Sequence, residues 1–265
     1  MNFMNLPEKY RKNAFFQILP IEYENNPTYG KGAKKGPKEI IKASKHLEYY
    51  DEQFDNEPFA KGIKTIKNKK EVNSKFTISL GGDHSITIGV VKDLEKKYKD
   101  FSVIILDAHP DMFHSWNNSQ YNHRCVSQRI SENHNILQIG IRSMDIDEKE
   151  IIDSKKNINI IKAYDFNKEK LKQELKKLKN KVYISIDVDV FDISFIRNTG
   201  TPEPGGFSWN QVIEILEEIF KNKEVIGADI NEFAPRYNFK AEAFSLAKLA
   251  YKIMALKILN KNLIK

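Results

Sequence analysis

The chain has 265 residues and a formal net charge of +7, with 40% apolar and 30% charged residues. This balance excludes a disordered or fibrous protein and suffices for one large α/β core. The sequence offers no run of ~20 apolar residues for a membrane helix, no apolar signal-peptide core near its start, and a single cysteine, Cys125, so we expect a cytoplasmic protein without an intrachain disulfide.

Apolar strand-like runs alternate with helical segments along the chain. One helix is expected to start at Gly36-Pro37, and four more to cover about 85–98, 168–181, 208–220 and 241–259. Ser208 and Gln211 form a capping box for the helix at 208–220. Strands are expected at 15–21, 76–80, 101–106, 136–141, 158–164, 182–190 and 225–230. This order predicts a single three-layer α/β domain, with a mostly parallel sheet covered by helices on both faces.

The lysines that produce the positive charge are spread along the chain. Their densest run, 168–181, places Leu171, Leu175 and Leu178 at helical intervals, which indicates an amphipathic helix with a charged outer face. A solvated surface therefore explains the charge better than nucleic-acid binding, for which a clustered patch would be needed.

Polar side chains follow the apolar runs of four expected strands, 76–80, 101–106, 182–186 and 225–228. Ligands of open parallel sheets bind at the carboxyl ends of the strands, and the residues found there are Asp83 and His84; Asp107, His109 and Asp111; Asp187 and Asp189; Asp229 and Glu232. We expect these four strand ends to point at one region.

The spacing within these clusters indicates a metal site. Residues two apart share a face of an extended chain, so Asp107, His109 and Asp111 could project together, as could Asp187 and Asp189. Aspartates gathered in this way repel one another unless cations neutralise them. Carboxylates with two imidazoles form a hard donor set that suits Mn²⁺ better than structural Zn²⁺, and the resulting charge balance favours a cationic substrate.

At these residues the sequence resembles the ureohydrolase family, which contains arginases and agmatinases. The similar segments come in family order: Gly-Gly-Asp-His-Ser at 81–85, Asp-Ala-His-Pro-Asp at 107–111, Ser-Ile-Asp-Val-Asp-Val-Phe-Asp at 185–192, Gly-Thr-Pro-Glu-Pro-Gly-Gly at 200–206 and Asp-Ile-Asn-Glu-Phe-Ala-Pro at 229–235. Residues 29–30 and 36–37 are similar as well. The resemblance therefore covers nearly the whole chain.

The resemblance implies a hydrolase that cleaves a guanidino compound to urea and an amine with two Mn²⁺ ions per subunit, in a homo-oligomer such as a trimer or hexamer. One metal would be held by His84, Asp107, Asp111 and Asp187, and the other by Asp107, His109, Asp187 and Asp189. The implied catalytic residues are His123, which would shuttle protons, Asp111 and Glu232. Glu232, His123 and Thr201 would contact the substrate.

Within the family the chain is most similar to the agmatinases, through residues 121–126, Arg129-Ile130 and the 200–206 segment. Agmatine is therefore the expected substrate. Three residues depart from the family pattern: Arg124 replaces a small residue, and Ile193 and Arg197 replace prolines. Arg124 could alter the pocket mouth or point to solvent, and the loss of both prolines should leave the 193–200 loop less rigid.

Several alternatives remain open from the sequence. The same chemistry could act on arginine, guanidinobutyrate or formiminoglutamate, or the fold could belong to a single-zinc deacetylase. His46 and His134 are expected to be surface or packing residues, His114 is a weaker catalytic candidate, and Cys125 is expected to be a small packed residue.

Overall fold

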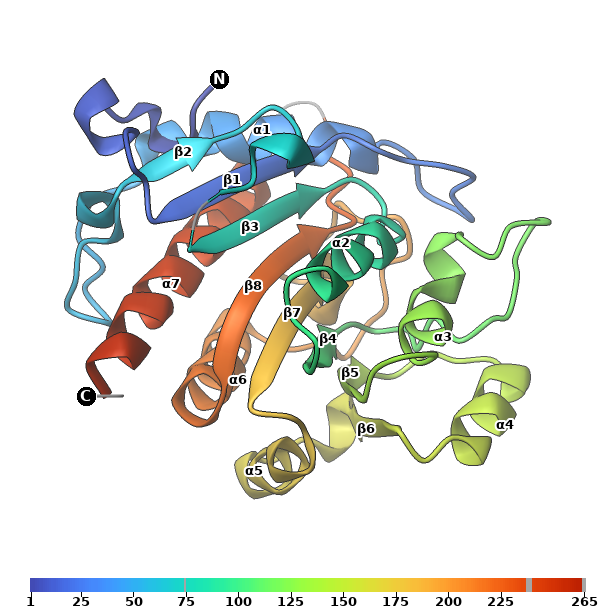
Figure 1. Ribbon diagram of the computed structural model, residues 1–265. Coiled ribbons are helices and arrows are strands. Elements are labelled where there is room, and N and C mark those ends of the chain that lie inside the picture. Colours follow the sequence, from blue (N-terminus) through green and yellow to red (C-terminus); the bar gives the residue numbers. More distant parts are fainter. Residues whose placement is uncertain (74, 237–239, 264–265) are drawn as a thin grey trace.

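The computed structural model describes residues 1–73, 75–236 and 240–263 and contains an eight-stranded sheet in which all neighbouring strands run parallel (Figure 1). The strand order is β2-β1-β3-β8-β7-β4-β5-β6. The strands are β1 (Phe16–Ile21), β2 (Ile63–Thr65), β3 (Phe76–Gly81), β4 (Ser102–Leu106), β5 (Ile136–Ile141), β6 (Ile158–Lys162), β7 (Lys181–Asp187) and β8 (Glu224–Asn231). The parallel α/β fold expected from the sequence is confirmed.

Seven α-helices are described: α1 (Gly36–Ala43), α2 (Ile86–Glu95), α3 (Val126–Ile130), α4 (Ile146–Ser154), α5 (Lys168–Lys177), α6 (Trp209–Asn222) and α7 (Ala241–Leu263). Figure 1 shows α5, α6 and α7 behind the sheet and α2 in front of it. Local signals start several of them: Pro37 lies in the first turn of α1, and the Ser208–Gln211 capping box precedes α6.

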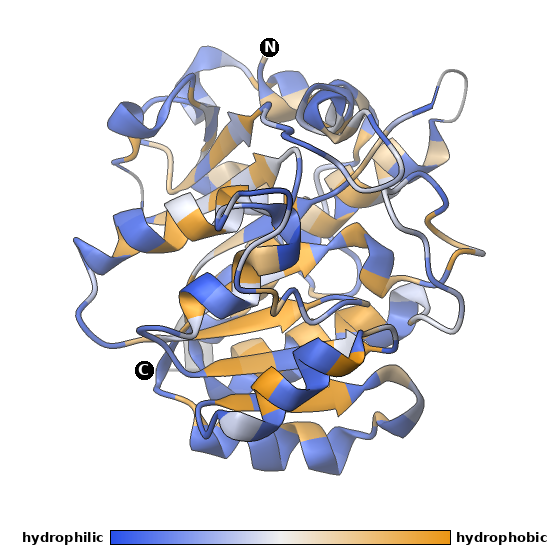
Figure 2. Ribbon diagram, turned by 90° about the vertical axis from the view of Figure 1, so that its right-hand side faces the viewer, coloured by the Kyte–Doolittle hydropathy of each residue, from blue (hydrophilic) through white to orange (hydrophobic). Residues whose placement is uncertain are grey.

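The core forms where the central strands meet the long helices. Every side chain of β4 and β5 is buried, as expected for strands covered on both faces. In Figure 2 the strands are largely hydrophobic, whereas the helices alternate between apolar and hydrophilic stripes. In the described part of the chain, no helix combines the length and the apolarity that crossing a membrane requires.

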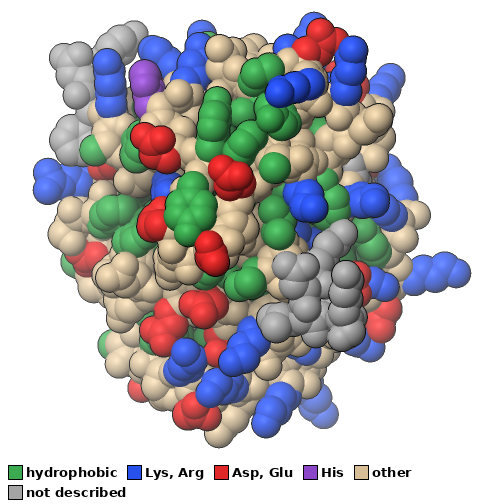
Figure 3. Space-filling model, turned by 90° about the vertical axis from the view of Figure 1, so that its left-hand side faces the viewer, with side chains coloured by type: hydrophobic (Ala, Val, Ile, Leu, Met, Phe, Trp, Pro, Cys, Tyr) green, Lys and Arg blue, Asp and Glu red, His purple; other side chains and the backbone are tan. Residues whose placement is uncertain are grey.

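Charged side chains of both signs are interspersed on the face drawn in Figure 3. The run 168–181 follows the same pattern, because Lys172 and Lys177 of α5 pair with Glu169 and Glu174 while Leu171 and Leu175 are buried. The helix with a charged outer face is thus confirmed over Lys168–Lys177, but it ends before Leu178 and does not extend to residue 181.

The sequence misplaced some element boundaries. The strand expected at 182–190 ends at Asp187 and is followed by a 3-10 turn over Val188–Val190. The helix expected at 85–98 ends at Glu95, and β2 and α3, with three and five residues, were not expected. Strands β3, β8, β7 and β4 are neighbours, so the four polar strand ends do meet at one edge of the sheet.

Candidate metal centre and active site

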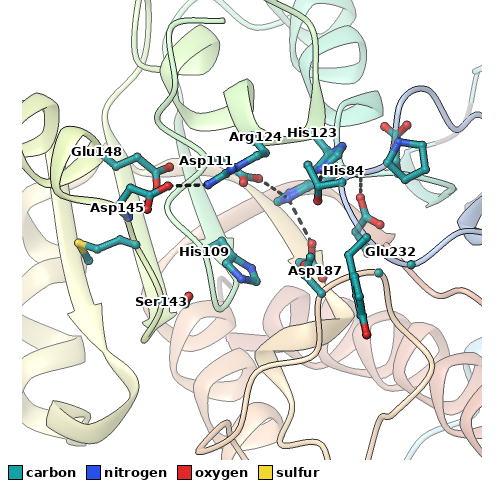
Figure 4. A pocket seen from close by; sticks show the side chains of 18 residues that line it. His84, His109, Asp111, His123, Arg124, Ser143, Asp145, Glu148, Asp187 and Glu232 are labelled. Atoms are coloured by element: carbon teal, nitrogen blue, oxygen red, sulfur yellow. Dashed lines mark hydrogen bonds and ion pairs between the residues drawn. The ribbon is translucent and has the colours of Figure 1, made fainter. Parts of the chain in front are cut away.

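A first group of potential metal ligands consists of His84, Asp107 and Asp111, all buried. Nδ1 of His84 lies 3.1 Å from Oδ2 of Asp107. The same nitrogen lies 3.1 Å from Oδ2 of Asp111 (Figure 4). Among the described residues, His84 Nδ1 and Asp107 Oδ2 have no hydrogen-bond partner although both atoms are buried. Buried polar atoms are rarely left unsatisfied, so these two lone-pair donors have the placement of metal ligands.

A second group, Asp107, His109 and Asp189, shares Asp107 with the first. Nδ1 of His109 lies 3.0 Å from Oδ2 of Asp189 and 3.7 Å from Oδ1 of Asp107. The remaining candidate, Asp187, belongs to neither group, but its Oδ2 lies 3.5 Å from His84 Nδ1. The structure therefore brings all six predicted metal ligands together, with Asp107 between the two groups.

The buried carboxylates of this cluster repel one another, and this repulsion shifts the pKa values of the groups around them. Burial and the charge of Asp107 raise the pKa of Asp111 to about 7, and burial with the charges of Asp189 and Asp107 raises the pKa of Asp187 well above its ordinary value. Burial opposes protonation of His109, but Asp189 and Asp107 raise its pKa to about 12. The cluster thus gathers positive charge around its carboxylates, as expected of a site that binds cations.

The backbone reaches this geometry by a route that the sequence did not predict. Asp107, His109 and Asp111 do not lie on one extended segment, since Asp111 has φ +51° in the left-handed region. Asp187 and Asp189 are separated by a turn in which the Asp187 side chain accepts a hydrogen bond from the Asp189 backbone N–H. A shared strand face required an extended backbone, and this condition is not met, although the same side chains converge.

A buried polar network contacts His84 at Nε2, the ring nitrogen that is not the candidate metal ligand. Nε2 of His84 lies 2.9 Å from Oγ of Ser185, and Ser185 donates to Oδ1 of Asp229 at 2.6 Å. Asp229 also accepts hydrogen bonds from Tyr183 and Thr87. Asp229 lies within β8 and is fully buried, so the expectation that it follows a strand end and faces the site was wrong. It lies one layer behind the ligands and fixes the orientation of the imidazole.

Replacing Asp229 by Asn is expected to lower metal affinity by about 10–100-fold, because partners of a ligating histidine typically contribute that much. Competition with a fluorescent chelator would measure it. Tyr183→Phe is the matched control: it removes another bond to the same carboxylate but leaves the Ser185 link intact. Equal affinities for D229N and Y183F would contradict this positioning role.

A pocket of about 240 Å³ opens over the two groups. Glu232, His123 and Arg124 line it (Figure 4). Thr201 and Thr28 line it as well. The structure thus places every predicted substrate-contacting residue at one cavity.

Glu232 and His123 have unusual environments in this pocket. Glu232 has φ +65° and accepts a hydrogen bond from the His84 backbone N–H at 2.7 Å. Burial and the charge of Asp83 raise the pKa of Glu232 well above its ordinary value, a cost that a cationic ligand would relieve. Burial and the charge of His84 lower the pKa of His123 to about 4. Nε2 of His123 lies 3.3 Å from Oγ1 of Thr28.

Arg124 lines the pocket. Its guanidinium lies over the rings of Phe113 and Trp116, at 4.3 and 4.0 Å from their centroids, and pairs with Asp145 at 2.9 Å. These contacts fix the arginine at the wall of the pocket. The sequence left open whether Arg124 lies at the pocket mouth or points to solvent, and the structure supports the pocket mouth.

The loop after β7 is held by three residues to which sequence reasoning gave no role. Arg142 donates to five backbone carbonyls, among them those of Asp189, Glu203 and Pro204. Asp192 accepts from the backbone N–H groups of Ser194, Gly205 and Gly206, and Glu242 accepts from those of Arg197 and Asn198. Hydrogen bonds thus anchor this loop without the two missing prolines. Arg142 directly follows β5, so its position at a strand end could have marked it as a candidate, as it did for Asp107.

The remaining candidates lie outside the site. His114 is bonded to Arg129 and Gln120 rather than to a ligand group. His134 is buried against Phe101 O and Glu95. Cys125 is fully buried, which confirms that it is a packed small residue.

Comparison with known proteins agrees with this geometry. The sequence profile described as the Arginase family matches residues 14–256. N(1)-aminopropylagmatine ureohydrolase of Synechocystis is 34% identical over 91% of this chain and 89% of its own length, and agmatinase of Pyrococcus horikoshii is 33% identical over 96% and 95%. The structure of agmatine ureohydrolase of Thermoplasma volcanium superposes with a TM-score of 0.84 at 29% identity, covering 94% of this chain and 92% of that one.

These matches span the ligand groups, the pocket and the sheet that supports them. They favour urea-releasing hydrolysis over the deacetylase alternative. The chain therefore belongs to the Arginase family, and it is a ureohydrolase.

Proposed function

We propose that this ureohydrolase cleaves agmatine to putrescine and urea with two divalent metal ions, and that manganese is the preferred metal. The observation that carries the proposal is the acidic composition of the pocket lining. Its lining holds six carboxylates against a single arginine, Arg124; the carboxylates are Asp83, Asp111, Asp145, Glu148, Asp187 and Glu232. Such a cavity favours a cationic guanidinium compound over an anionic one.

The chemistry of the donor set supports the metal assignment. The six proposed ligands offer carboxylate oxygens and imidazole nitrogens without thiolate, a combination that suits Mn²⁺. Asp107 would serve both ions, since it belongs to both groups. When bound, two divalent cations would offset the carboxylate repulsion and bring the pKa of bound water toward neutrality.

The chain's own residues would bind and position the substrate. The Glu232 carboxylate lies beside His84 and can accept paired N–H bonds from a planar guanidinium. His123, neutral near pH 7 because its pKa is lowered, can take up a proton at Nε2 and deliver it to the leaving amine. Thr28 orients that nitrogen, and Thr201 lines the same pocket.

A urea assay tests the proposal. Purified protein loaded with Mn²⁺ should release urea from agmatine much faster than from arginine or guanidinobutyrate, and prior chelation should abolish release. Faster turnover of arginine would overturn the substrate assignment, and formamide release from formiminoglutamate would indicate a different amidine substrate.

N(1)-aminopropylagmatine is a second candidate, favoured by one observation. The pocket extends past the ligand groups to Asp145 and Glu148 at the start of α4, where a further amine of a longer substrate could lie. The Synechocystis relative carries this compound in its name. A higher kcat/KM for the aminopropyl compound than for agmatine would select it.

The remaining sequence expectations are part of the proposal. The chain would form a single domain, act in the cytoplasm as a homo-oligomer, and supply putrescine for polyamine synthesis.

A further inference from the structure

A second cavity, of about 730 Å³, lies on the face of the sheet that carries α2 and shares no lining residue with the catalytic pocket. Its floor is formed by side chains of β1, β3, β8 and β7, and one wall by α2. The apolar residues among its lining are Leu19, Ile21, Val72, Ile86, Ile88, Val90, Leu94 and Ile226, with four tyrosines. We call this cavity the α2 groove.

The groove exists because one crossover connection lacks a helix. β1 leads to β2 through α1, and the chain then returns from β2 across β1 to β3. Parallel crossovers are right-handed and usually helical, so this return runs on the face opposite α1. The described residues of the connection, 66–73 and 75, contain only the 3-10 turn Lys69–Glu71. In Figure 1, the described part of this connection crosses in front of β1 with a short turn instead of an α-helix.

The dimensions of the groove match a helix. Four neighbouring strands contribute to its floor, and at ~4.8 Å per strand they span roughly 14 Å. A helix with its side chains is about 10 Å across, and ten residues extend about 15 Å. A single alkyl chain would leave most of this floor uncovered. A helix packed beside α2 would restore the layer that the short connection omits.

The rim of the groove determines the charge of its occupant. Lys69, Lys70, Lys75, Lys92 and Lys97 line it, against one carboxylate, Asp93. Asp93 is already paired, with Lys69 at 3.0 Å and Lys96 at 2.6 Å. Complementary potentials favour specific association, so a helix that covers the floor should carry acidic residues along its flanks.

We propose that the α2 groove binds an amphipathic helix of about three turns, supplied by a different protein, whose apolar face covers the sheet and whose acidic flanks meet the lysines. The groove and the catalytic pocket have separate linings. Binding is therefore expected whichever guanidino substrate the enzyme takes.

The test uses the full metal-loaded chain and three labelled, blocked peptides of about 14 residues. The first places Leu at helical i, i+3, i+4 and i+7 positions with Glu elsewhere; the second replaces Glu by Lys; the third scrambles the Leu positions of the first. Fluorescence anisotropy at about 0.15 M salt should show binding of the first peptide, with the other two at least about tenfold weaker.

Two variants would test whether the peptide binds in the α2 groove. Gly89 of α2 lines it, and a Cβ added there would meet no atom within 4 Å, so Gly89→Trp should fill the space without straining the fold. K92E/K97E leaves three lysines against three carboxylates in the lining and should therefore abolish the preference for the Glu peptide over the Lys peptide. The matched control, K172E/K177E, changes two lysines of α5 that lie outside the groove lining. Urea release should be unchanged in all three.

Several results would overturn the proposal. They are equal binding of the three peptides, no binding at about 1 mM, or binding that survives Gly89→Trp. Light scattering that shows self-association dispersed by Gly89→Trp would assign the groove to a second copy of this chain instead. Loss of urea release in every sample, with peptide binding intact, would count against the proposed activity alone.

Discussion

Substitution of Asp107 by Ala is expected to remove both metal ions, whereas His84→Ala and His109→Ala should each remove one. Asp107 is the residue shared by the two groups, while His84 belongs to the first and His109 to the second. Elemental analysis after gel filtration would give the metal content of each variant. Urea release should fall by at least about 10³-fold in all three, because both the activated water and the charge neutralisation depend on the pair.

His134→Ala provides the control for removal of a buried histidine. His134 is packed between Phe101 O and Glu95, away from the ligand groups. Its variant should keep the metal content of the unmodified protein even where its thermal stability falls. Two results would refute the shared-ligand arrangement: a D107A variant that retains one ion, or an H84A variant that loses both while circular dichroism shows an intact fold.

The sequence predicted the elements whose signals are local and strong. Long apolar runs such as β4 and β5 are recognisable because both faces of the strand are buried. The Ser208–Gln211 box marked the start of α6 for a similarly local reason. β2 and α3 have only three and five residues, which is too short for periodicity to separate them from loop. They depend on tertiary contacts instead.

The sequence predicted which residues form the site, but it did not predict the backbone conformation that brings them together. The convergence of His84, Asp107 and Asp187 follows from the adjacency of β3, β4, β7 and β8. The left-handed φ of Asp111 is a tertiary outcome, since its contact with His84 and the hydrogen bond from the Gln128 backbone N–H to its carbonyl hold the residue in place. Asp229 was misassigned because a polar residue within a buried strand looks like one at its end when the strand boundary is uncertain by a few residues.

Supporting residues were the hardest to foresee. Ser185 is a polar residue inside an apolar strand, which is a usable signal, but its partners His84 and Asp229 come from distant parts of the chain. Arg142 acts through backbone carbonyls, which any sequence supplies. The position of Arg142 directly after β5 marks it as a candidate, but its carbonyl partners leave no pattern in a single sequence. The loop anchoring that replaces the missing prolines could therefore be seen only in three dimensions.

Replacing His123 by Ala is expected to lower kcat for urea release by about 10²–10⁴-fold, the range that a positioned acid–base group contributes. Metal content should be unchanged, since His123 belongs to neither ligand group. Added imidazole should restore part of the lost rate, because it can carry the same proton into the space left in the pocket. His114→Ala is the matched control: this histidine is exposed and bonded to Arg129 and Gln120, so neither its rate nor its response to imidazole should differ from those of the unmodified enzyme.

The pH dependence gives an independent test of the same role. Burial and the charges of His84 and Arg124 lower the pKa of His123 to about 4, from an ordinary 6.5. The neutral imidazole that accepts a proton is therefore present throughout the neutral range, and its contribution is lost only as the pH falls toward about 4. The rates of the unmodified enzyme and H123A could instead become equal already near pH 6.5. That result would show that the His123 imidazole has an unperturbed pKa and is exposed. A kcat unaffected by H123A at pH 7.5 would assign proton delivery to another residue.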